Sequence, residues 1–514
     1  MTDNPIAAAV APGYQFTGAA LELGGLMLDE TTLSEVHIKI PLGMLNRHGL
    51  VAGATGTGKT KTLQLLAEQL SANGVPVFAA DIKGDLSGMS TPGTEDDKIK
   101  ARAASVGQTW QAQGFPVTYY ALGGQGTGIP LRVTMTSFGP VLLSKVLGLN
   151  ATQESSLGLV FHFADQAGLP LLDLGDLRDV VKYLVSDEGK AELKDLGGLS
   201  SATAGVILRE LITLESQGAD VFFGEPELES SDLLQVTPDG RGVVSMVELP
   251  NLQDRPALFS TFLMWLLADL YHDLPEVGDP EKPKLVFFFD EAHLLFDDAS
   301  KAFLDQVAQT VRLIRSKGVG VFFVTQSPTD VPDDVLAQLG SRVQHQLRAA
   351  TPNDAKALKQ TVNTYPTSSY PDLGKVILSL GIGEAVITVM DERGAPTPVA
   401  WTRLRAPESL MGPADASAME AAVRASPGWA TYSQVVDRES ASEKLKNRME
   451  AGADKAAAEQ AAKGGSGGRA APQPKPAKPQ DSTFDKVVKS STFKYAVRYA
   501  AREAVRGVFG IGRR

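Results

Sequence analysis

The residues Gly53–Thr60, GATGTGKT, combine glycines with a lysine and a hydroxyl side chain at the spacing G-x-x-x-x-G-K-[ST]. They lie between an apolar segment, residues 49–53, and a segment with helical apolar spacing, residues 61–74. Glycines let a loop wrap so that backbone N–H groups face phosphate oxygens, and a helix N-terminus adds partial positive charge. The pattern predicts a phosphate-binding loop, and the alternative is a glycine-rich turn that matches by chance.

Two side chains of this loop have expected roles in chemistry. Lys59 is placed to reach the β- and γ-phosphates of a nucleotide, and the Thr60 hydroxyl is placed to hold Mg²⁺. The residues expected to contact the nucleotide are Gly53, Ala54, Thr55, Gly56, Thr57, Gly58, Lys59, Thr60 and Lys61.

A second apolar segment, residues 284–289, ends in two carboxylates, Asp290 and Glu291. In a parallel sheet the carboxyl end of this strand lies beside the phosphate loop. Asp290 is then expected to hold the water shell of Mg²⁺, and Glu291 to orient and polarise the attacking water. The alternative is that the pair caps the following helix. For His293, a structural or coupling role and a direct role both stay open.

A short polar turn follows the strand that ends the first strand–loop–helix–strand unit. Asp81, Lys83 and Asp85 lie in it, and Gly84 permits a tight turn. These side chains are expected either to face the nucleotide or a central channel, or to form a solvated polar turn.

Arg315 and Gln326 lie at the two ends of the apolar strand expected over residues 319–326. An amide at the tip of such a strand can sense a γ-phosphate or the attacking water. Arg315, at the end of a helix expected over 301–316, is separated from that tip by roughly 25 Å at ~3.3 Å per residue. It can reach a neighbour's nucleotide if subunits stack in a ring, where it would neutralise transition-state charge. The alternative is a cation that stabilises its helix C-terminus.

Strands and helices alternate around these motifs, which predicts an α/β fold with a mainly parallel sheet. An N-terminal segment is expected at 1–42, and a nucleotide-binding core at 43–94 and 241–405. Residues 95–240 are expected to form a mostly helical insertion. A C-terminal extension and flexible linker are expected at 406–480, because residues 443–480 form an Ala/Lys/Glu stretch followed by a Gly/Pro/Lys-rich one. Further strands are expected at 344–349 and 384–390.

The composition of the 514 residues limits the classes of function. The net charge of −11 argues against a protein that coats itself in nucleic acid by bulk charge, although a local basic channel is compatible with it. The absence of cysteine excludes disulfides, thiolate metal sites and cysteine nucleophiles. No secretion signal and no apolar run near the ~20 residues of a membrane span are found. We therefore expect a cytoplasmic protein.

The last segment, residues 481–514, is expected to form a basic amphipathic helix. Lys494, Arg498, Arg502 and Arg506 recur every four residues, with apolar and aromatic residues between them. Such a helix can lie on an anionic membrane, bind DNA phosphates, or dock on its own ring.

Taken together, the segments LNRHGLVAGATGTGKT, FAADIKGDL, VFFFDEAH and IRSKGVGVFFVTQSP resemble the HerA/FtsK group of ring-forming ATPases. The chain looks most similar to the bacterial HerA-like subfamily typified by YjgR, over residues 40–405 and in its C-terminal tail. The resemblance implies a P-loop NTPase core of the RecA/ASCE type, ATP and Mg²⁺ as cofactors, and a hexamer that moves DNA through a central pore. It matches Lys59 and Thr60 to the phosphate loop.

The resemblance also implies further site residues. Asp290 and Glu291 match the Walker B pair, Gln326 the sensor and Arg315 the arginine finger. Arg47 matches a second arginine of HerA-type proteins. Asp81–Asp85 resembles the D-P-K-G-[DE] turn of conjugative coupling ATPases.

The sequence departs from the family at its start, since about 42 residues are too few for the N-terminal β-barrel on which a nuclease partner docks. The expected function is an ATP-driven DNA translocase or helicase-like motor. The alternative is a ring that hydrolyses ATP to switch partners, as an assembly factor or membrane-associated scaffold. A small-molecule kinase is a third interpretation, less suited to Arg315 and the helical insertion.

Overall fold

The computed structural model describes residues 4–193, 197–249, 256–296, 299, 301–436 and 438–464. The chain separates into two compact units. The first comprises residues 1–132, 216–222 and 226–435, and the second comprises 133–215, 223–225 and 436–514. The linker expected up to residue 480 lies partly, and the tail at 481–514 wholly, outside the described residues. The domain boundaries inferred from sequence stay predictions.

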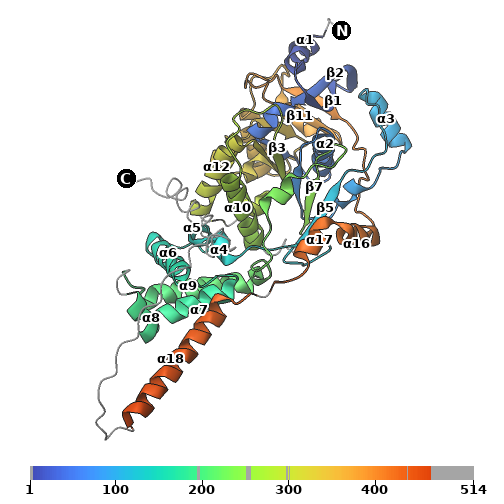
Figure 1. Cartoon of the computed structure of the whole chain (residues 1–514). Helices are drawn as coiled ribbons and strands as arrows, with labels where there is room; N and C mark the ends of the chain where they lie inside the picture. The colour runs from blue at the N-terminus through green and yellow to red at the C-terminus, as the bar shows by residue number, and fades with distance from the viewer. Residues whose placement is uncertain are drawn as a thin grey trace. The chain divides into compact units, whose positions relative to one another are not determined.

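One large sheet forms the centre of the first unit (Figure 1). Among the described residues it has twelve strands in the order β2-β1-β12-β11-β10-β3-β9-β8-β4-β7-β5-β6. Their bounds are β1 Ala20–Leu28, β2 Thr31–Pro41, β3 Gly49–Ala52, β4 Val77–Asp81, β5 Val117–Leu122, β6 Ile129–Leu131, β7 Val244–Glu248, β8 Leu285–Phe289, β9 Val319–Thr325, β10 Ser341–Gln344, β11 Glu384–Thr388 and β12 Ala400–Leu404.

The sheet is parallel from β10 to β6 and antiparallel from β2 to β10. The predicted α/β fold with a mainly parallel sheet is therefore confirmed. Because β3, β9, β8 and β4 are neighbours and parallel, the loops after their carboxyl ends meet at one edge of the sheet.

The central strands are apolar along their whole length because both faces of the sheet are covered. Every residue of β8 and of β9 is buried, as expected for parallel strands with elements packed on both sides. Aromatic rings connect neighbouring strands: the ring centroids of Phe288 and Phe322 are 5.4 Å apart, and those of Phe78 and Phe287 are 5.0 Å apart. This packing holds the carboxyl ends of these strands in register.

Helices of the first unit pack around this sheet (Figure 1). The longest is α10, whose Phe262 lies 6.3 Å from the Phe78 ring of β4. The helices are α1 Pro5–Val10, α2 Lys59–Ala72, α3 Asp97–Ser105, α10 Pro256–Asp273, α11 His293–Phe296, α12 Lys301–Ile314, α13 Asp333–Leu336, α14 Pro352–Asn363, α15 Leu373–Ser379, α16 Ala416–Ala425 and α17 Pro427–Tyr432.

Short 3₁₀ turns connect several elements of the first unit. Two of them, η2 Leu42–Arg47 and η6 Arg315–Lys317, are separated by a single residue from the start of β3 and β9. The others are η1 Ala11–Tyr14, η3 Ser87–Ser90, η4 Ala219–Val221, η5 Ser230–Leu234 and η7 Pro328–Asp330.

The second unit is helical in its described residues. The Ser442 backbone N–H at the start of α18 donates to Asp176 of α7 at 2.9 Å, and Arg438 forms an ion pair with the buried carboxylate of Glu225. Its helices are α4 Met135–Phe138, α5 Pro140–Val146, α6 Ala151–Gln166, α7 Leu174–Leu184, α8 Asp187–Glu192, α9 Ser201–Ser216 and α18 Ala441–Gly464.

Two features differ from the sequence-based expectations for individual elements. The strand expected at 344–349 is wrong, since β10 spans Ser341–Gln344; it ends there because its parallel partner β3 ends at Ala52 and turns into the phosphate loop. The stretch expected to be mostly helical at 95–240 also contributes two strands, β5 and β6, to the main sheet. None of the helices in the described residues combines the length and hydropathy of a membrane span.

Candidate active site

The phosphate loop connects the buried strand β3 to the first residue of α2, Lys59. Two of its glycines have backbone angles that disfavour other residues, with φ of 84° at Gly56 and 110° at Gly58. At Gly53, an added Cβ would lie 2.4 Å from the His345 side chain. The loop is fixed to its neighbours, because the Gly53 N–H donates to the Thr325 carbonyl and the Ala54 N–H donates to the Gln346 carbonyl.

The side chain of Lys59 lies inside this loop. Its ammonium donates to the carbonyl oxygens of Gly53, at 2.7 Å, and Ala54, at 3.3 Å. Burial lowers the Lys59 pKa, while the carboxylates of Glu291 and Asp290 favour its charge. A buried ammonium bound by two carbonyls of a glycine loop fits the phosphate chain of a nucleotide.

The two residues after Lys59 have different surroundings. Thr60 lies in the first turn of α2 and is partly exposed. The Lys61 ammonium donates to Gln64 Oε1 at 3.2 Å, and burial lowers its pKa against the opposing effect of Asp85 and Asp81. Thr60 is therefore placed beside the loop, whereas Lys61 is engaged within its own helix.

Asp290 follows the carboxyl end of β8, which the sheet places near the phosphate loop. Its Oδ1 accepts from the Glu291 N–H at 2.9 Å, and its Oδ2 is a buried oxygen with no hydrogen-bond partner among the described residues. Burial, reinforced by the neighbouring Glu291 charge, raises the Asp290 pKa to about 7. A buried oxygen of this kind fits Mg²⁺ or a water bound to it, because Mg²⁺ prefers carboxylate and water ligands.

Glu291 has an unusual backbone conformation and lies among basic side chains. Its φ is 49°, in the left-handed region that few residues other than glycine adopt. The Lys83 ammonium forms an ion pair with Oε1, and His293 Nδ1 lies 3.3 Å from Oε2. Burial opposes the Glu291 charge, but Lys83, His293 and Lys59 outweigh it and lower the pKa.

The turn after β4 carries Lys83 to this site. The buried Asp81 carboxylate accepts from the backbone N–H groups of Lys83, Gly84 and Leu86, at 3.1, 2.8 and 2.8 Å. Gly84 has a φ of 75°. The interpretation as a solvated turn is therefore wrong for Asp81, which is fully buried because it organises the turn from inside.

Gln326 lies one residue beyond β9 and is exposed. The strand lies between β3 and β8, so this side chain follows the carboxyl end that separates the phosphate loop from Glu291. The adjacent Thr325 is fixed on both sides, since its carbonyl accepts from Gly53 N–H and its hydroxyl donates to Asp330 at 2.8 Å. The structure thus brings Gln326 to the same edge as Lys59, Asp290 and Glu291.

Arg47 and Arg315 lie at the opposite edge. Arg47 ends η2 just before β3, and Arg315 begins η6 just before β9. Their guanidinium groups converge on one carboxylate oxygen of Asp279, at 3.2 and 3.3 Å. The seven residues of β9 separate this edge from Gln326 by roughly 23 Å.

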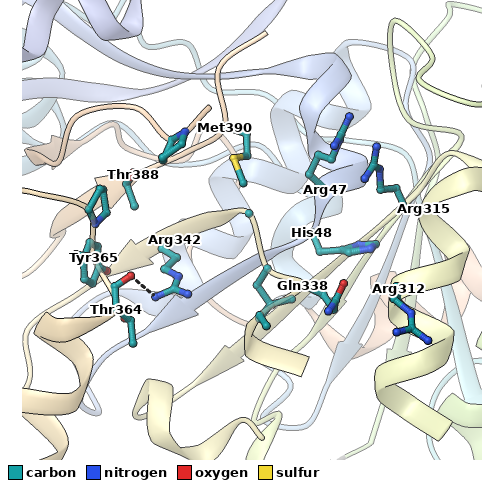
Figure 2. A pocket seen from close by; sticks show the side chains of 15 residues that line it. Arg47, His48, Arg312, Arg315, Gln338, Arg342, Thr364, Tyr365, Thr388 and Met390 are labelled. Atoms are coloured by element: carbon teal, nitrogen blue, oxygen red, sulfur yellow. Dashed lines mark hydrogen bonds between the residues drawn. The ribbon is translucent and has the colours of Figure 1, made fainter. Parts of the chain in front are cut away.

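A cavity of about 550 Å³ lies beside these two arginines (Figure 2). Arg312 of α12 and Arg342 of β10 also line it, and Figure 2 shows all four guanidinium side chains around it. Arg342 donates to the Thr364 carbonyl at 3.1 Å, and burial lowers its pKa. Clustered guanidinium groups favour phosphate or carboxylate ligands.

The family model described as Helicase HerA-like C-terminal matches residues 27–514. The chain belongs to this HerA-like family. The resemblance inferred from the sequence motifs is therefore confirmed.

Curated relatives of this HerA-like chain are remote in sequence. The chain is 20% identical over 369 residues to "DNA double-strand break repair helicase HerA" of Sulfolobus acidocaldarius, covering 71% of this chain and 66% of the relative. It is 20% identical over 358 residues to the protein of the same name from Saccharolobus solfataricus, covering 68% of this chain and 63% of the relative. The alignments thus span just under two thirds of the relatives' length.

Solved structures support the fold of the HerA-like chain. The plasmid coupling protein TrwB in complex with the non-hydrolysable GTP analogue GDPNP matches with a TM-score of 0.50 at 16% identity, covering 77% of this chain and 99% of that one. A trigonal form of bacterial conjugative coupling protein TrwB with sulphate also matches with a TM-score of 0.50 at 16% identity, covering 80% of this chain and 100% of that one. The likeness confirms the P-loop NTPase fold.

The structure of the HerA-like chain adds residues that the motifs did not single out. Lys83 was recognised only as part of a polar turn, and its contact with Glu291 joins residues 208 positions apart. Asp279 has no motif around it. Arg312 gave a weak signal, because it precedes Arg315 by three residues in the helix expected over 301–316, and such residues are neighbours on a helix surface.

Proposed function

We propose that this chain is a ring-forming ATPase of the HerA class, in which each active site is completed by a neighbouring copy. The observation that carries this proposal is the division of the charged residues between two edges of one sheet. Lys59, Asp290 and Glu291 follow the carboxyl ends of parallel strands, whereas Arg47 and Arg315 precede the amino ends. Each chain therefore carries both sets of charged residues, but at opposite edges of its sheet.

The carboxyl edge binds and positions ATP in this proposal. The loop Gly53–Gly58 offers backbone N–H groups to the phosphates, and Lys59 exchanges its carbonyl partners for phosphate oxygens. Thr60 and Asp290 would hold Mg²⁺, which neutralises phosphate charge as the γ-phosphoryl group is transferred. Glu291 orients the attacking water, and Gln326 donates to the γ-phosphate or that water.

The amino edge supplies the arginines to the next subunit. A head-to-tail contact whose rotation closes forms a ring, and we propose a hexamer. In that contact Arg315, with Arg47 beside it, would exchange Asp279 for the neighbour's phosphates. Arginine is suited to this exchange because its planar guanidinium binds phosphate with two parallel hydrogen bonds.

DNA is the proposed substrate of the motor, supported by the curated relatives named as DNA repair helicases. The net charge of −11 confines any DNA contact to local basic surface. The test is the ATPase rate of rings of known size with and without single- and double-stranded DNA. Stimulation that falls with added salt supports a DNA motor. A rate that neither form of DNA changes would instead support an ATP-driven switch.

A further inference from the structure

We propose that Lys83 is a latch that holds Glu291 aside until the γ-phosphate of ATP draws the lysine away. This inference rests on the proposed ATPase function and adds a positioning residue to it. Lys83 would have two alternative anions, the Glu291 carboxylate and the γ-phosphate. Glu291 would become fully basic towards the attacking water once Lys83 has changed partners.

The first support is the position of the Lys83 side chain. Three hydrogen bonds to the buried Asp81 carboxylate fix the backbone of its turn, including the Lys83 N–H itself. From this fixed base the ammonium forms an ion pair with Glu291. The Lys83 side chain is 39% exposed, whereas that of Glu291 is 9% exposed. The lysine therefore has room to move, while the carboxylate is confined.

The second support is the local charge. Glu291 is faced by Lys83 from the turn after β4, Lys59 from α2 and His293 from α11, with Asp290 beside it in the chain. An ammonium paired with one carboxylate oxygen favours the charged form and makes the carboxylate a weaker base towards a water molecule. Loss of the Lys83 pairing would therefore make Glu291 a stronger base for polarising a water molecule.

The third support is the position of the turn. It follows β4, which is hydrogen-bonded to β8, the strand that ends at Asp290 and Glu291. Lys59, at the phosphate loop, contributes to the charge environment of both Lys83 and Glu291. A γ-phosphate bound by Lys59 would thus enter the same group of charges and compete with Glu291 for Lys83.

The pair itself is tested without nucleotide, by a double-mutant cycle on thermal unfolding. Lys83→Met leaves the confined Glu291 carboxylate without its main partner. The midpoint temperature of thermal unfolding should therefore fall by roughly 2–4 °C. In the Glu291→Gln background the same substitution should lower the midpoint by less than half as much. Equal losses in the two backgrounds would overturn the pairing. Should Lys83→Met fail to fold, rescue by Glu291→Gln supports the pair and failure of both variants contradicts it.

The exchange of partners is tested by binding, with ADP and with the non-hydrolysable β,γ-imido analogue of ATP as probes. Lys83→Met should weaken binding of the ATP analogue roughly tenfold, the effect of losing one charge-assisted contact, and change ADP binding by less than about threefold. Lys83→Arg keeps the charge and should retain the parent's preference. Lys100→Met, which removes an exposed ion-paired lysine on α3, is the matched control and should change neither affinity.

Equal weakening of both nucleotides, or none, would overturn the latch. A parent chain that binds neither nucleotide would overturn the proposed function together with the exchange of partners. The unfolding cycle distinguishes the two failures, because it measures the Lys83–Glu291 pair in the absence of nucleotide.

Discussion

Arg315 and Gln326 lie at opposite ends of one strand, β9, and both are proposed to act on a bound nucleotide. Arg315 lies just before the strand and shares Asp279 with Arg47, whereas Gln326 follows the strand beside the phosphate loop. A rigid, fully buried strand cannot fold back to bring its two ends together. The separation therefore requires a second copy of the chain if both residues act on one nucleotide.

Replacing Lys59 by Ala should remove nucleotide binding, since the phosphate charge loses its main cationic partner. The measurement is binding of a fluorescent ATP analogue, with Lys100→Ala as the matched control. Unchanged affinity in the Lys59 variant would overturn the assignment of the phosphate loop.

Replacing Glu291 by Gln should leave ATP binding intact and reduce turnover by at least ~100-fold, because water activation is lost while the shape is kept. Binding and steady-state hydrolysis are measured on the same preparation. A variant that hydrolyses ATP at the parent rate would reduce Glu291 to a helix-capping residue.

Two aspartates should differ sharply in their effect on stability. Asp81→Ala removes the acceptor of three backbone N–H groups in a buried turn and should cost ~1–3 kcal/mol of unfolding free energy. Asp279→Ala removes a 61% exposed carboxylate and should cost less than ~1 kcal/mol. Chemical denaturation measures both. Equal losses would mean that the Asp279 contacts support the fold rather than restrain the arginines.

His48 should make the fold sensitive to acid. The Val321 N–H donates to its Nδ1 at 3.0 Å, and burial lowers its pKa to about 4. The unfolded chain, with a His pKa near 6.5, binds this proton more readily than the folded chain. The contribution of neutral His48 to the free energy of unfolding is thus complete above about pH 6.5 and is lost as the pH falls towards 4.

The measurement for His48 is the unfolding free energy of the parent and of His48→Asn between pH 7 and pH 4. The parent should lose more stability than the variant across this window, because Asn does not titrate. Parallel pH profiles would show that His48 is not buried in its neutral form.

The sequence predicted those parts of the fold and site that depend on local patterns. Residues 49–74 combine a strand, a glycine loop and an amphipathic helix, and the structure contains β3, the loop and α2 there. The apolar runs before Asp290 and Gln326 likewise predicted β8 and β9, since buried parallel strands are apolar on both faces.

Contacts between distant segments could not be predicted in the same way. The Lys83–Glu291 pair and the shared partner of Arg47 and Arg315 depend on which strands become neighbours in the sheet. No spacing in the sequence encodes that order. The end of β10 at Gln344 was missed for the same reason, because its partner β3, rather than its own residues, determines its length.

The central claim, a site shared between subunits, is tested most directly by mixing two inactive variants. Glu291→Gln and Arg315→Ala rings should each be nearly inactive. When the chains are mixed before assembly, an interface that takes Glu291 from one variant and Arg315 from the other is complete. Random mixing in a cyclic ring makes roughly a quarter of the interfaces complete.

The account therefore predicts that ATPase activity returns on mixing, to at most about a quarter of the parent rate and to less if sites fire in sequence. Subunit exchange must be demonstrated in the same samples, with differently labelled chains, because unmixed rings also show no rescue. If the chains exchange and no activity returns, Arg315 does not act on the nucleotide of a neighbouring subunit, and the shared site is contradicted.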